Sequence, residues 1–498
     1  MQKKIILIPL DERPCNYVFP QELLKNNDEY RLCVPPRSVL GNKKTPANLR
    51  ALDEFLYTES KSADIAIISV DMLLYGGLIA GRLHEKSRSE LNERLTLLKT
   101  LKEKNPKLKI YAFSLIMRCP RYSSSDEEPD YYAECGKEIF LLGEAEHKKK
   151  LGKPFDEENY EKLKTKCAPY INDYLTRRAV NVEMNLAVVD LVGSVIDYLI
   201  IPQDDSAVYG FMAMDQQRVR EYVEENRKQN LVSIYPGADE VAMTLLARAV
   251  QSDKGKMLTV NCFYSSEHGK FVVPLYEDRM LCESVKCQLR AAGLKEDCCD
   301  YDFSLAINAP SSDMTEASEQ GSNCVNYTVN RSLSEFANRI YTEIQRGRSV
   351  AVADVAYGNG GDISLVKMLD DYNIAGKISA YAGWNTSGNT LGTTIATAVF
   401  SKLFGKESTA DFIALRFFED VGFCSSARWS VSEELESFGV GYYDLKDKND
   451  KISERVAEKT QSAMRSFMPN FTNGYEITYC RMPWNRMFEV YFEVKRKD

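Results

Sequence analysis

The chain is poor in histidine. Only three of its 498 residues are histidines: His84, His147 and His268. Structural and catalytic zinc sites draw mainly on histidine and cysteine, so a histidine-rich zinc centre is nearly excluded. A Ser-His-Asp triad is poorly supplied for the same reason.

The cysteines lack the paired spacing of a disulfide or zinc framework. There are thirteen, an odd number, and no Cys-x-x-Cys pair occurs among them. This scatter is typical of reduced thiols and predicts a cytoplasmic protein. A nucleophilic cysteine at Cys15 or Cys119 is a further alternative, although neither has a histidine nearby in the sequence.

Long apolar runs and glycine-rich phosphate-binding motifs are also missing. No run has the length that a bilayer-spanning helix needs. The apolar stretch after Lys3-Lys4 is too short for the core of a signal peptide. No GxGxxG or GxxxxGK[ST] motif follows the first predicted strand. We therefore expect no membrane association, no dinucleotide site and no P-loop.

The chain has no excess of positive charge. Its net charge is −8, with 44% hydrophobic and 27% charged residues. A nonspecific nucleic-acid binder needs a basic surface, so we expect no nucleic-acid partner. This charge and composition suit a globular enzyme with a neutral or cationic small-molecule substrate. They are also compatible with a homo-oligomer.

Short β-branched and aromatic runs, bounded by proline, glycine and asparagine, predict strands. They lie at residues 5–10, 31–34, 65–70, 108–117, 198–202, 231–235, 258–264, 301–308, 350–356 and 378–382. Helical patterns lie between many of them, at residues 89–104, 215–227, 239–251, 333–345 and 391–403.

This alternation predicts an α/β fold with parallel strands. We expect a (β/α)8 barrel, regular or distorted, because barrel strands read as short continuous apolar runs. A pair of doubly wound parallel sheets is the alternative. The predicted catalytic domain spans residues 1–403 and carries a helical insertion at about residues 130–197. A helix at 410–422 and strands at 475–480 and 487–494 predict a small α+β unit over residues 404–498.

Carboxylates recur where predicted strands end. In parallel α/β folds, functional groups gather at the carboxyl ends of the strands. Several strand-end residues are therefore predicted to bind substrate: Asp11, Arg13, Asp71, Arg118, Tyr235, Asp239, Glu240, Asp354, Asn359, Asp362, Trp384 and Asn385. Arg82 lies beyond the motif that begins at Asp71.

The sharpest of these motifs is Gln203-Asp204-Asp205. Two like charges this close raise the pKa of one acid, which suits a general acid. Asp204 and Asp205 are therefore the predicted catalytic residues. The alternative is that Asp204 caps a turn and Asp205 is solvated.

Three other motifs each have a structural interpretation beside the functional one. Asp239 has the position of a helix cap, and Glu240 suits the first turn of a helix. Arg13 suits either a fork to a substrate carboxylate or an internal ion pair. Trp384 and Asn385 suit a sugar ring, because an indole face stacks on it while amides bind its hydroxyls. Those amides also satisfy a tight turn.

Five motifs together resemble a bacterial family classed as a domain of unknown function. They are Pro-Leu-Asp-Glu-Arg-Pro (9–14), Asp-Met…Tyr-Gly-Gly (71–77), Gln-Asp-Asp (203–205), Tyr-Pro-Gly-Ala-Asp-Glu (235–240) and Ala-Gly-Trp-Asn-Thr…Asn-Thr-Leu-Gly (382–392). The resemblance runs through nearly the whole chain and implies no catalytic assignment.

A looser likeness in the order of strand ends is to barrel β-N-acetylhexosaminidases. This likeness implies that Asp204 orients the acetamido group of the substrate and that Asp205 donates the proton. The carbonyl of the substrate is then the nucleophile. Tyr235 and Asn385 would hold the acetamido group, and Trp384 would form the pocket wall.

Three functions follow as hypotheses. The first is a glycoside hydrolase for an amino sugar or similar glycoside, without a cofactor. The second is a metal-dependent hydrolase that binds Mg²⁺, Mn²⁺ or Ca²⁺ through carboxylates. Its proposed ligands are Asp11, Asp71, Asp204, Asp239 and Asp362. The third is a noncatalytic carbohydrate or metabolite binder with the same residues.

Overall fold

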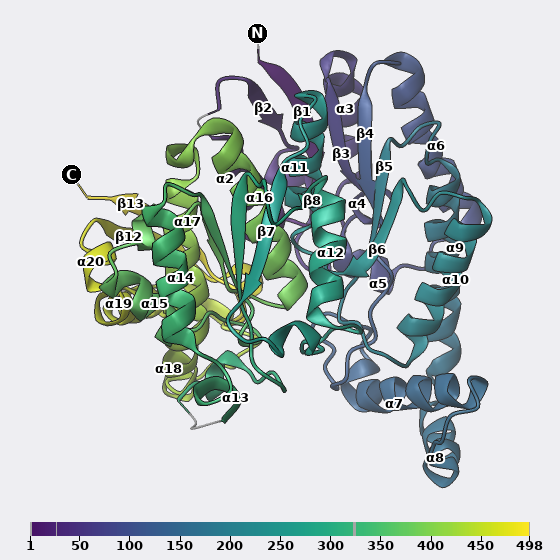
Figure 1. Ribbon diagram of the computed structural model, residues 1–498. Coiled ribbons are helices and arrows are strands. Elements are labelled where there is room, and N and C mark those ends of the chain that lie inside the picture. The colour runs from purple at the N-terminus through teal and green to yellow at the C-terminus, as the bar shows by residue number, and fades with distance from the viewer. Residues whose placement is uncertain (1, 26, 322–324, 498) are drawn as a thin grey trace. The chain divides into compact units, whose positions relative to one another are not determined.

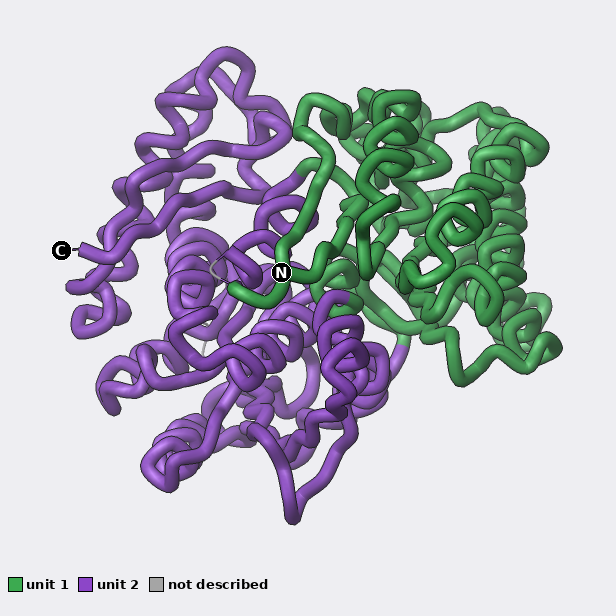
Figure 2. The backbone as a smooth tube through the Cα atoms, turned by 90° about the horizontal axis from the view of Figure 1, so that it is seen from above, with its two compact units in different colours: residues 1–12, 28–245, 276–278 green, residues 13–27, 246–275, 279–498 purple. Residues whose placement is uncertain are grey.

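The computed structural model describes residues 2–25, 27–321 and 325–497. The chain forms two compact units, shown in green and purple in Figure 2. Unit 1 comprises residues 1–12, 28–245 and 276–278. Unit 2 comprises residues 13–27, 246–275 and 279–498. Each unit has its own parallel sheet with helices between the strands (Figure 1).

The sheet of unit 1 has six parallel strands, each pairing with its neighbour in the same direction. In spatial order they are β2 (Tyr30–Cys33), β1 (Lys3–Ile8), β3 (Ile65–Ser69), β4 (Lys109–Phe113), β5 (Tyr198–Gln203) and β6 (Val232–Pro236). β2 lies on one side of β1, and β3 to β6 follow in chain order on the other side. This is the strand order of a doubly wound sheet. In such sheets, ligands bind at the carboxyl ends of the strands.

The helices of unit 1 join these strands. They are α3 (Leu49–Glu59), α4 (Val70–Tyr75), α5 (Leu78–Leu83), α6 (Arg88–Lys104), α7 (Tyr132–Lys150), α8 (Glu157–Cys167), α9 (Ile171–Asp190) and α10 (Phe211–Glu225). Local sequence sets several of their starts. Ser69 accepts a hydrogen bond from the Met72 N–H at the start of α4, and Ser87 with Glu90 forms a capping box on α6. The segment predicted as a helical insertion contains α7, α8 and α9.

The sheet of unit 2 has five parallel strands. In spatial order they are β11 (Ala380–Ala382), β10 (Val350–Asp354), β9 (Phe303–Asn308), β7 (Thr259–Tyr264) and β8 (Lys295–Glu296). When the five strands are numbered in chain order within this unit and read from β8 to β11, their spatial order is again 2-1-3-4-5. The second sheet therefore repeats the strand succession of the first.

Unit 2 adds many helices and a hairpin. Its helices are α1 (Pro14–Tyr17), α2 (Phe19–Leu24), α12 (Leu281–Ala292), α13 (Val325–Thr328), α14 (Leu333–Gln345), α15 (Ile363–Asp371), α16 (Ser387–Phe404), α17 (Ala410–Arg416), α18 (Arg428–Ser432), α19 (Asn449–Phe467) and α20 (Pro469–Thr472). A π-helical segment, Phe417–Ala427, joins α17 to α18. The hairpin pairs β12 (Tyr475–Arg481) with β13 (Tyr491–Arg496). Helix α11 (Val241–Asp253) begins in unit 1 and ends in unit 2.

The predicted parallel strands and the predicted helices are all present. Of the two predicted C-terminal strands, the second begins later than expected, at Tyr491. The predicted helix at 215–227 begins earlier than expected, at Phe211. The (β/α)8 barrel is not confirmed, because the parallel strands of the described residues form two sheets, of six and five strands. The predicted boundary after residue 403 lies inside unit 2. None of the described helices has the length and apolarity needed to cross a membrane.

Candidate active site

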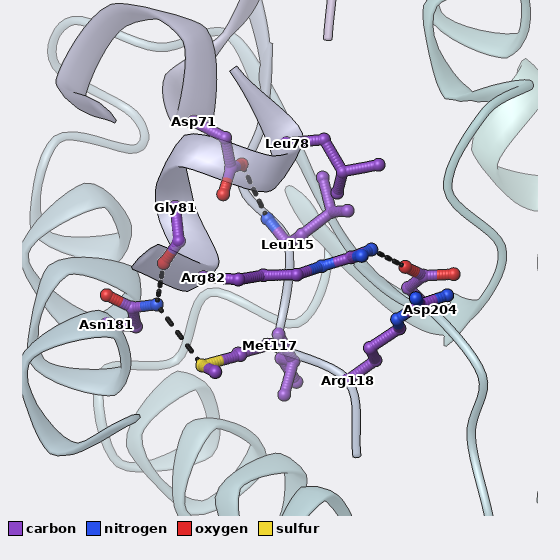
Figure 3. A pocket seen from close by; sticks show the side chains of 10 residues that line it. Asp71, Leu78, Gly81, Arg82, Leu115, Met117, Arg118, Asn181 and Asp204 are labelled. Carbon is purple, nitrogen blue, oxygen red and sulfur yellow. Dashed lines mark hydrogen bonds and ion pairs between the residues drawn. The ribbon is translucent and has the colours of Figure 1, made fainter. Parts of the chain in front are cut away.

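A pocket lies at the carboxyl ends of β3, β4 and β5 in unit 1 (Figure 3). It encloses about 270 Å³ between its lining atoms, including space open to solvent. Its walls come from α4, α5, α9 and the segments that follow β4 and β5. The lining residues are Asp71, Leu78, Gly81, Arg82, Leu115, Ile116, Met117, Arg118, Asn181 and Asp204. The sequence predicted three of them as site residues: Asp71, Arg118 and Asp204.

Arg82, on α5, extends across this pocket to Asp204 (Figure 3). Its Nη2 donates to Asp204 Oδ2 at 2.6 Å. Its Nη1 donates to Glu127 Oε2 at 2.9 Å and to Glu128 Oε1 at 3.2 Å. Only 3% of the Arg82 side chain is exposed, so these charge-assisted bonds fix the guanidinium in one position.

Arg118 follows β4 and binds the same acidic group from another direction. Its Nε donates to Glu128 Oε1 at 2.7 Å, and its Nη2 donates to Glu127 Oε2 at 2.9 Å. Its Nη1 donates to Asp205 Oδ2 at 3.0 Å. Arg82 and Arg118 therefore share Glu127 and Glu128, and each holds one member of the aspartate pair.

Asp204 and Asp205 form the turn directly after β5. Their side chains are 18% and 20% exposed, so both carboxyl groups reach the surface. Asp205 has a φ of 45°, in the left-handed region that side chains other than glycine seldom adopt. Such strain in a non-glycine residue is concentrated at functional sites. Burial and the neighbouring charge of Asp204 raise the pKa of Asp205 to about 6, while Arg118 and Arg82 oppose this shift.

Asp71 lines the pocket and is a second acid with a perturbed pKa at this end of the sheet. It lies in the first turn of α4, and its Oδ2 accepts a hydrogen bond from the Leu115 N–H at 2.9 Å. Burial raises the pKa of Asp71 to about 7, against the opposing effects of that N–H and of Arg82. Two carboxyl groups of one site therefore titrate near neutral pH, which is typical of acid–base chemistry.

The other predicted residues of unit 1 are buried near strand ends. Asp11 follows β1, and Tyr235 lies in β6 opposite Pro202 of β5. Asp239 and Glu240 precede α11, and a carboxylate oxygen of Glu240 accepts from the Ala238 N–H at 2.9 Å. None of these residues lines the pocket.

Asp354 and Asp362 lie in unit 2, in a buried network of hydrogen bonds. Asp354 accepts from Asn308 Nδ2 at 2.8 Å, from the Asp362 N–H at 2.7 Å and from Tyr381 Oη at 2.9 Å. Asp362 caps α15 and pairs with Arg331 at 2.9 Å. Burial and the charge of Asp362 raise the pKa of Asp354 to about 7. These contacts hold the strand-end loops of the second sheet together.

The remaining predicted residues also belong to unit 2. The Arg13 guanidinium lies 4.6 Å from the centre of the Trp484 ring and pairs with Glu489 at 3.4 Å. Trp384 is buried, and its indole N–H donates to Thr393 Oγ1 at 3.1 Å. The Asn359 N–H donates to the Asn385 carbonyl at 2.8 Å, and both residues have positive φ. The predicted sugar-binding residues Trp384 and Asn385 therefore follow β11 of the second sheet, whereas Asp204 and Asp205 follow β5 of the first.

The predicted carboxylate metal site does not form a compact group. Within residues 2–25, 27–321 and 325–497, one group of at least three close ligand side chains is present, Asp297-Cys298-Cys299. It contains none of Asp11, Asp71, Asp204, Asp239 and Asp362. Asp362 also belongs to a different unit from the other four.

Three residues that shape this site were not predicted as site residues. They are Arg82, which lies just beyond the motif of Asp71, and the two acids Glu127 and Glu128. The acidic run Asp126-Glu127-Glu128 shortly after Arg118 is a local signal that points to a charged loop at this strand end. Glu127 and Glu128 lie 45 and 46 positions after Arg82 in the chain. No local sequence pattern predicts a contact across that distance.

The comparison with protein families confirms the resemblance that the motifs predicted. The family described as "Protein of unknown function (DUF4127)" matches residues 5–493, and the chain belongs to this family. A comparison with curated proteins found no match.

Proposed function

We propose that this member of the DUF4127 family is a glycoside hydrolase whose catalytic centre is the Asp204–Asp205 pair of unit 1. Asp205 is the proton donor, and Asp204 orients the substrate. The proposed substrate is an amino sugar glycoside. The observation that carries this proposal is that each aspartate is held by a different buried arginine while the pKa of Asp205 is raised to about 6.

The two acids are adjacent in sequence but differ in their surroundings. Asp204 makes a short, direct contact with Arg82, which favours a fixed carboxylate that accepts hydrogen bonds from a substrate. Asp205 lies in a strained turn, and its raised pKa lets it carry a proton in mildly acidic solution. A pair of acids whose environments separate their roles in this way is the pattern of acid–base hydrolases.

The charge balance supports a neutral or cationic substrate. Asp71, Glu127, Glu128, Asp204 and Asp205 surround two guanidinium groups in the described site. Because carboxylates outnumber arginines, an anionic substrate would be repelled. Hydroxyl groups and the acetamido N–H of an N-acetylated amino sugar would instead donate hydrogen bonds to the carboxylates.

The proposed reaction follows the substrate-assisted route. Asp205 gives its proton to the glycosidic oxygen as the bond from that oxygen to C1 breaks. The acetamido oxygen of the substrate attacks C1, and Asp204 accepts a hydrogen bond from the acetamido N–H. Water then attacks C1 and gives a proton to Asp205, while the bond between C1 and the acetamido oxygen breaks and the free sugar is released. No metal takes part in this scheme.

The test compares turnover of aryl glycosides, including N-acetylglucosaminide and N-acetylgalactosaminide, by wild type, Asp205→Asn and Asp215→Asn. Asp215 is a matched control, because it also pairs with a buried arginine, Arg178, but lies on α10, outside the turn that follows β5. We expect Asp205→Asn to lower kcat by about 10²-fold or more. Asp215→Asn should retain most of the turnover.

The same panel, repeated with EDTA, separates the competing hypotheses. Turnover that disappears with EDTA and returns with Mg²⁺ or Mn²⁺ would favour the metal-dependent hydrolase. Saturable binding of the sugar without product, measured by calorimetry, would favour the noncatalytic binder. Full turnover by Asp205→Asn would contradict the role assigned to Asp205.

A further inference from the structure

The hairpin β12–β13 of unit 2 has an open strand edge beside a large groove. Figure 1 shows the hairpin next to α17. The groove encloses about 900 Å³, including space open to solvent. It is lined by every residue of β13 and by residues in and around α2 and α17, namely Val18, Glu22, Lys25, Asp411 and Leu415. An open edge next to such a space offers room for one more strand.

The backbone of β13 presents alternate residues to this groove. The Lys497 N–H donates to the Gly474 carbonyl at 2.9 Å, so residue 497 faces β12. Hydrogen-bonding direction alternates along an antiparallel strand. Lys495 and Glu493 therefore also bond toward β12, while Arg496, Val494 and Phe492 direct their N–H and C=O groups outward. Outside the hairpin, no hydrogen bond from these three N–H groups occurs among the described residues.

The side chains of β13 divide in the same alternation. Phe492 is buried, with its ring 6.3 Å from that of Phe423, and Val494 follows it on the same face. Glu493 and Lys495 lie on the other face and are exposed. The outer face of the edge therefore carries one negative and one positive charge, two residues apart.

We propose that the occupant of this groove is β13 of a second copy of the chain, paired antiparallel about a twofold axis at Val494. Val494 then exchanges both hydrogen bonds with Val494 of the second copy, and Phe492 does so with Arg496. The two hairpins become one four-stranded antiparallel sheet. The interface is isologous, because the same edge serves both copies.

Charge complementarity selects this register. With Val494 on the axis, Glu493 lies directly opposite Lys495 of the second copy, twice in the dimer. This is a non-hydrogen-bonded position, where opposing Cα atoms are only about 4.5 Å apart. A shift of two residues either way keeps the hydrogen bonding but places Glu493 opposite Glu493, or Lys495 opposite Lys495. Like charges directly opposite each other are destabilising.

The test measures the mass of the full chain in solution by light scattering and sedimentation. Wild type should have twice the mass of the monomer. Glu493→Lys places lysine opposite lysine, and Lys495→Glu places glutamate opposite glutamate. We expect each variant to weaken dimerisation by about tenfold or more. Glu335→Lys, the same charge change at an exposed position of α14, should remain dimeric.

Mixing the two single variants gives the decisive measurement. In the mixed dimer every lysine faces a glutamate again, so the equimolar mixture should dimerise as tightly as wild type, whereas each variant alone dimerises about tenfold or more weakly. This rescue also shows that both variants are folded. A monomeric wild type, single variants that dimerise as tightly as wild type, or a mixture that dimerises no more tightly than the single variants would each overturn the proposal.

Discussion

At the scale of the residue, the proton on Asp205 controls the proposed reaction. Its pKa is raised to about 6, so the carboxyl loses its proton, and its ability to donate it, as pH rises through that value. Arg118 lowers this pKa, because its positive charge stabilises the carboxylate. Arg118→Gln should therefore shift the basic limb of kcat/KM to higher pH.

This shift is measured in the pH profile of turnover. Arg94→Gln is the matched control, because Arg94, on α6, pairs with Asp53 of α3 at 2.9 Å and does not line the pocket. It should leave the basic limb in place. A limb that moves to lower pH in Arg118→Gln, or does not move, would show that the limb reports another group.

Asp354 offers a stability test at the same scale. Its carboxylate accepts hydrogen bonds from three donors, Asn308, Tyr381 and the Asp362 N–H. Asp354→Asn replaces one acceptor oxygen by an NH₂ group that faces a donor. We expect urea denaturation to show a loss of about 1–3 kcal/mol. Asp371→Asn, at an exposed position of α15, should change stability by less than about 0.5 kcal/mol. An equal loss in both variants would contradict the argument.

The residues of the site were predictable only in part. Asp204 and Asp205 stand out in sequence, because two acids directly follow a buried strand. Arg82 binds Asp204 across 122 positions, so its place in the site depends on how the strands pair. The same limit applies to Trp384, which reads as a sugar platform in sequence but is packed edge-on against Phe19 at 5.7 Å in unit 2.

At the scale of the element, Gly422 permits close packing of the π-helical segment. A Cβ atom at this position would lie 2.7 Å from Met464 Cγ and 2.9 Å from Thr460 Cγ2, both on α19. Gly422→Ala should therefore destabilise the protein by about 1–3 kcal/mol through overpacking. Gly376→Ala is the control, because nothing lies within 4 Å of its added Cβ. Equal thermal unfolding of the two variants would contradict this packing argument.

Strands were easier to predict than their arrangement. Most of the longer strands of the two parallel sheets are buried apolar runs, and these runs are local in sequence. The two-residue strand β8 (Lys295–Glu296) is exposed and carries no such pattern. A barrel and an open parallel sheet bury their strands in the same way, so the pattern alone does not distinguish them.

At the scale of the whole molecule, the chain passes repeatedly between its two units. Residues 13–27 and 276–278 are short excursions from one unit into the other, and α11 changes unit at residues 245 and 246. A helix that continues across a boundary has no linker composition. This explains why the sequence predicted one catalytic domain up to residue 403, whereas two sheets of the same strand order divide that region.

Buried acids in both units predict how stability depends on pH. Burial raises the pKa of Asp71 and of Asp354 to about 7, and burial with the charge of Asp420 raises the pKa of Glu419 to about 8. Between the unfolded and folded pKa values, the folded state holds more protons than the unfolded state. The free energy of unfolding therefore falls as pH rises through this window.

Thermal unfolding should show this loss between about pH 6.5 and about pH 8.5, by roughly 1–3 kcal/mol. His84 and His147, whose pKa values are lowered by burial, act in the opposite direction only at lower pH. Glu419→Gln keeps a neutral side chain beside Arg416 at every pH, so its loss over this range should be smaller than in wild type. Stability that rises with pH, or an unchanged slope in Glu419→Gln, would show that these carboxyl groups do not hold their protons in the folded protein.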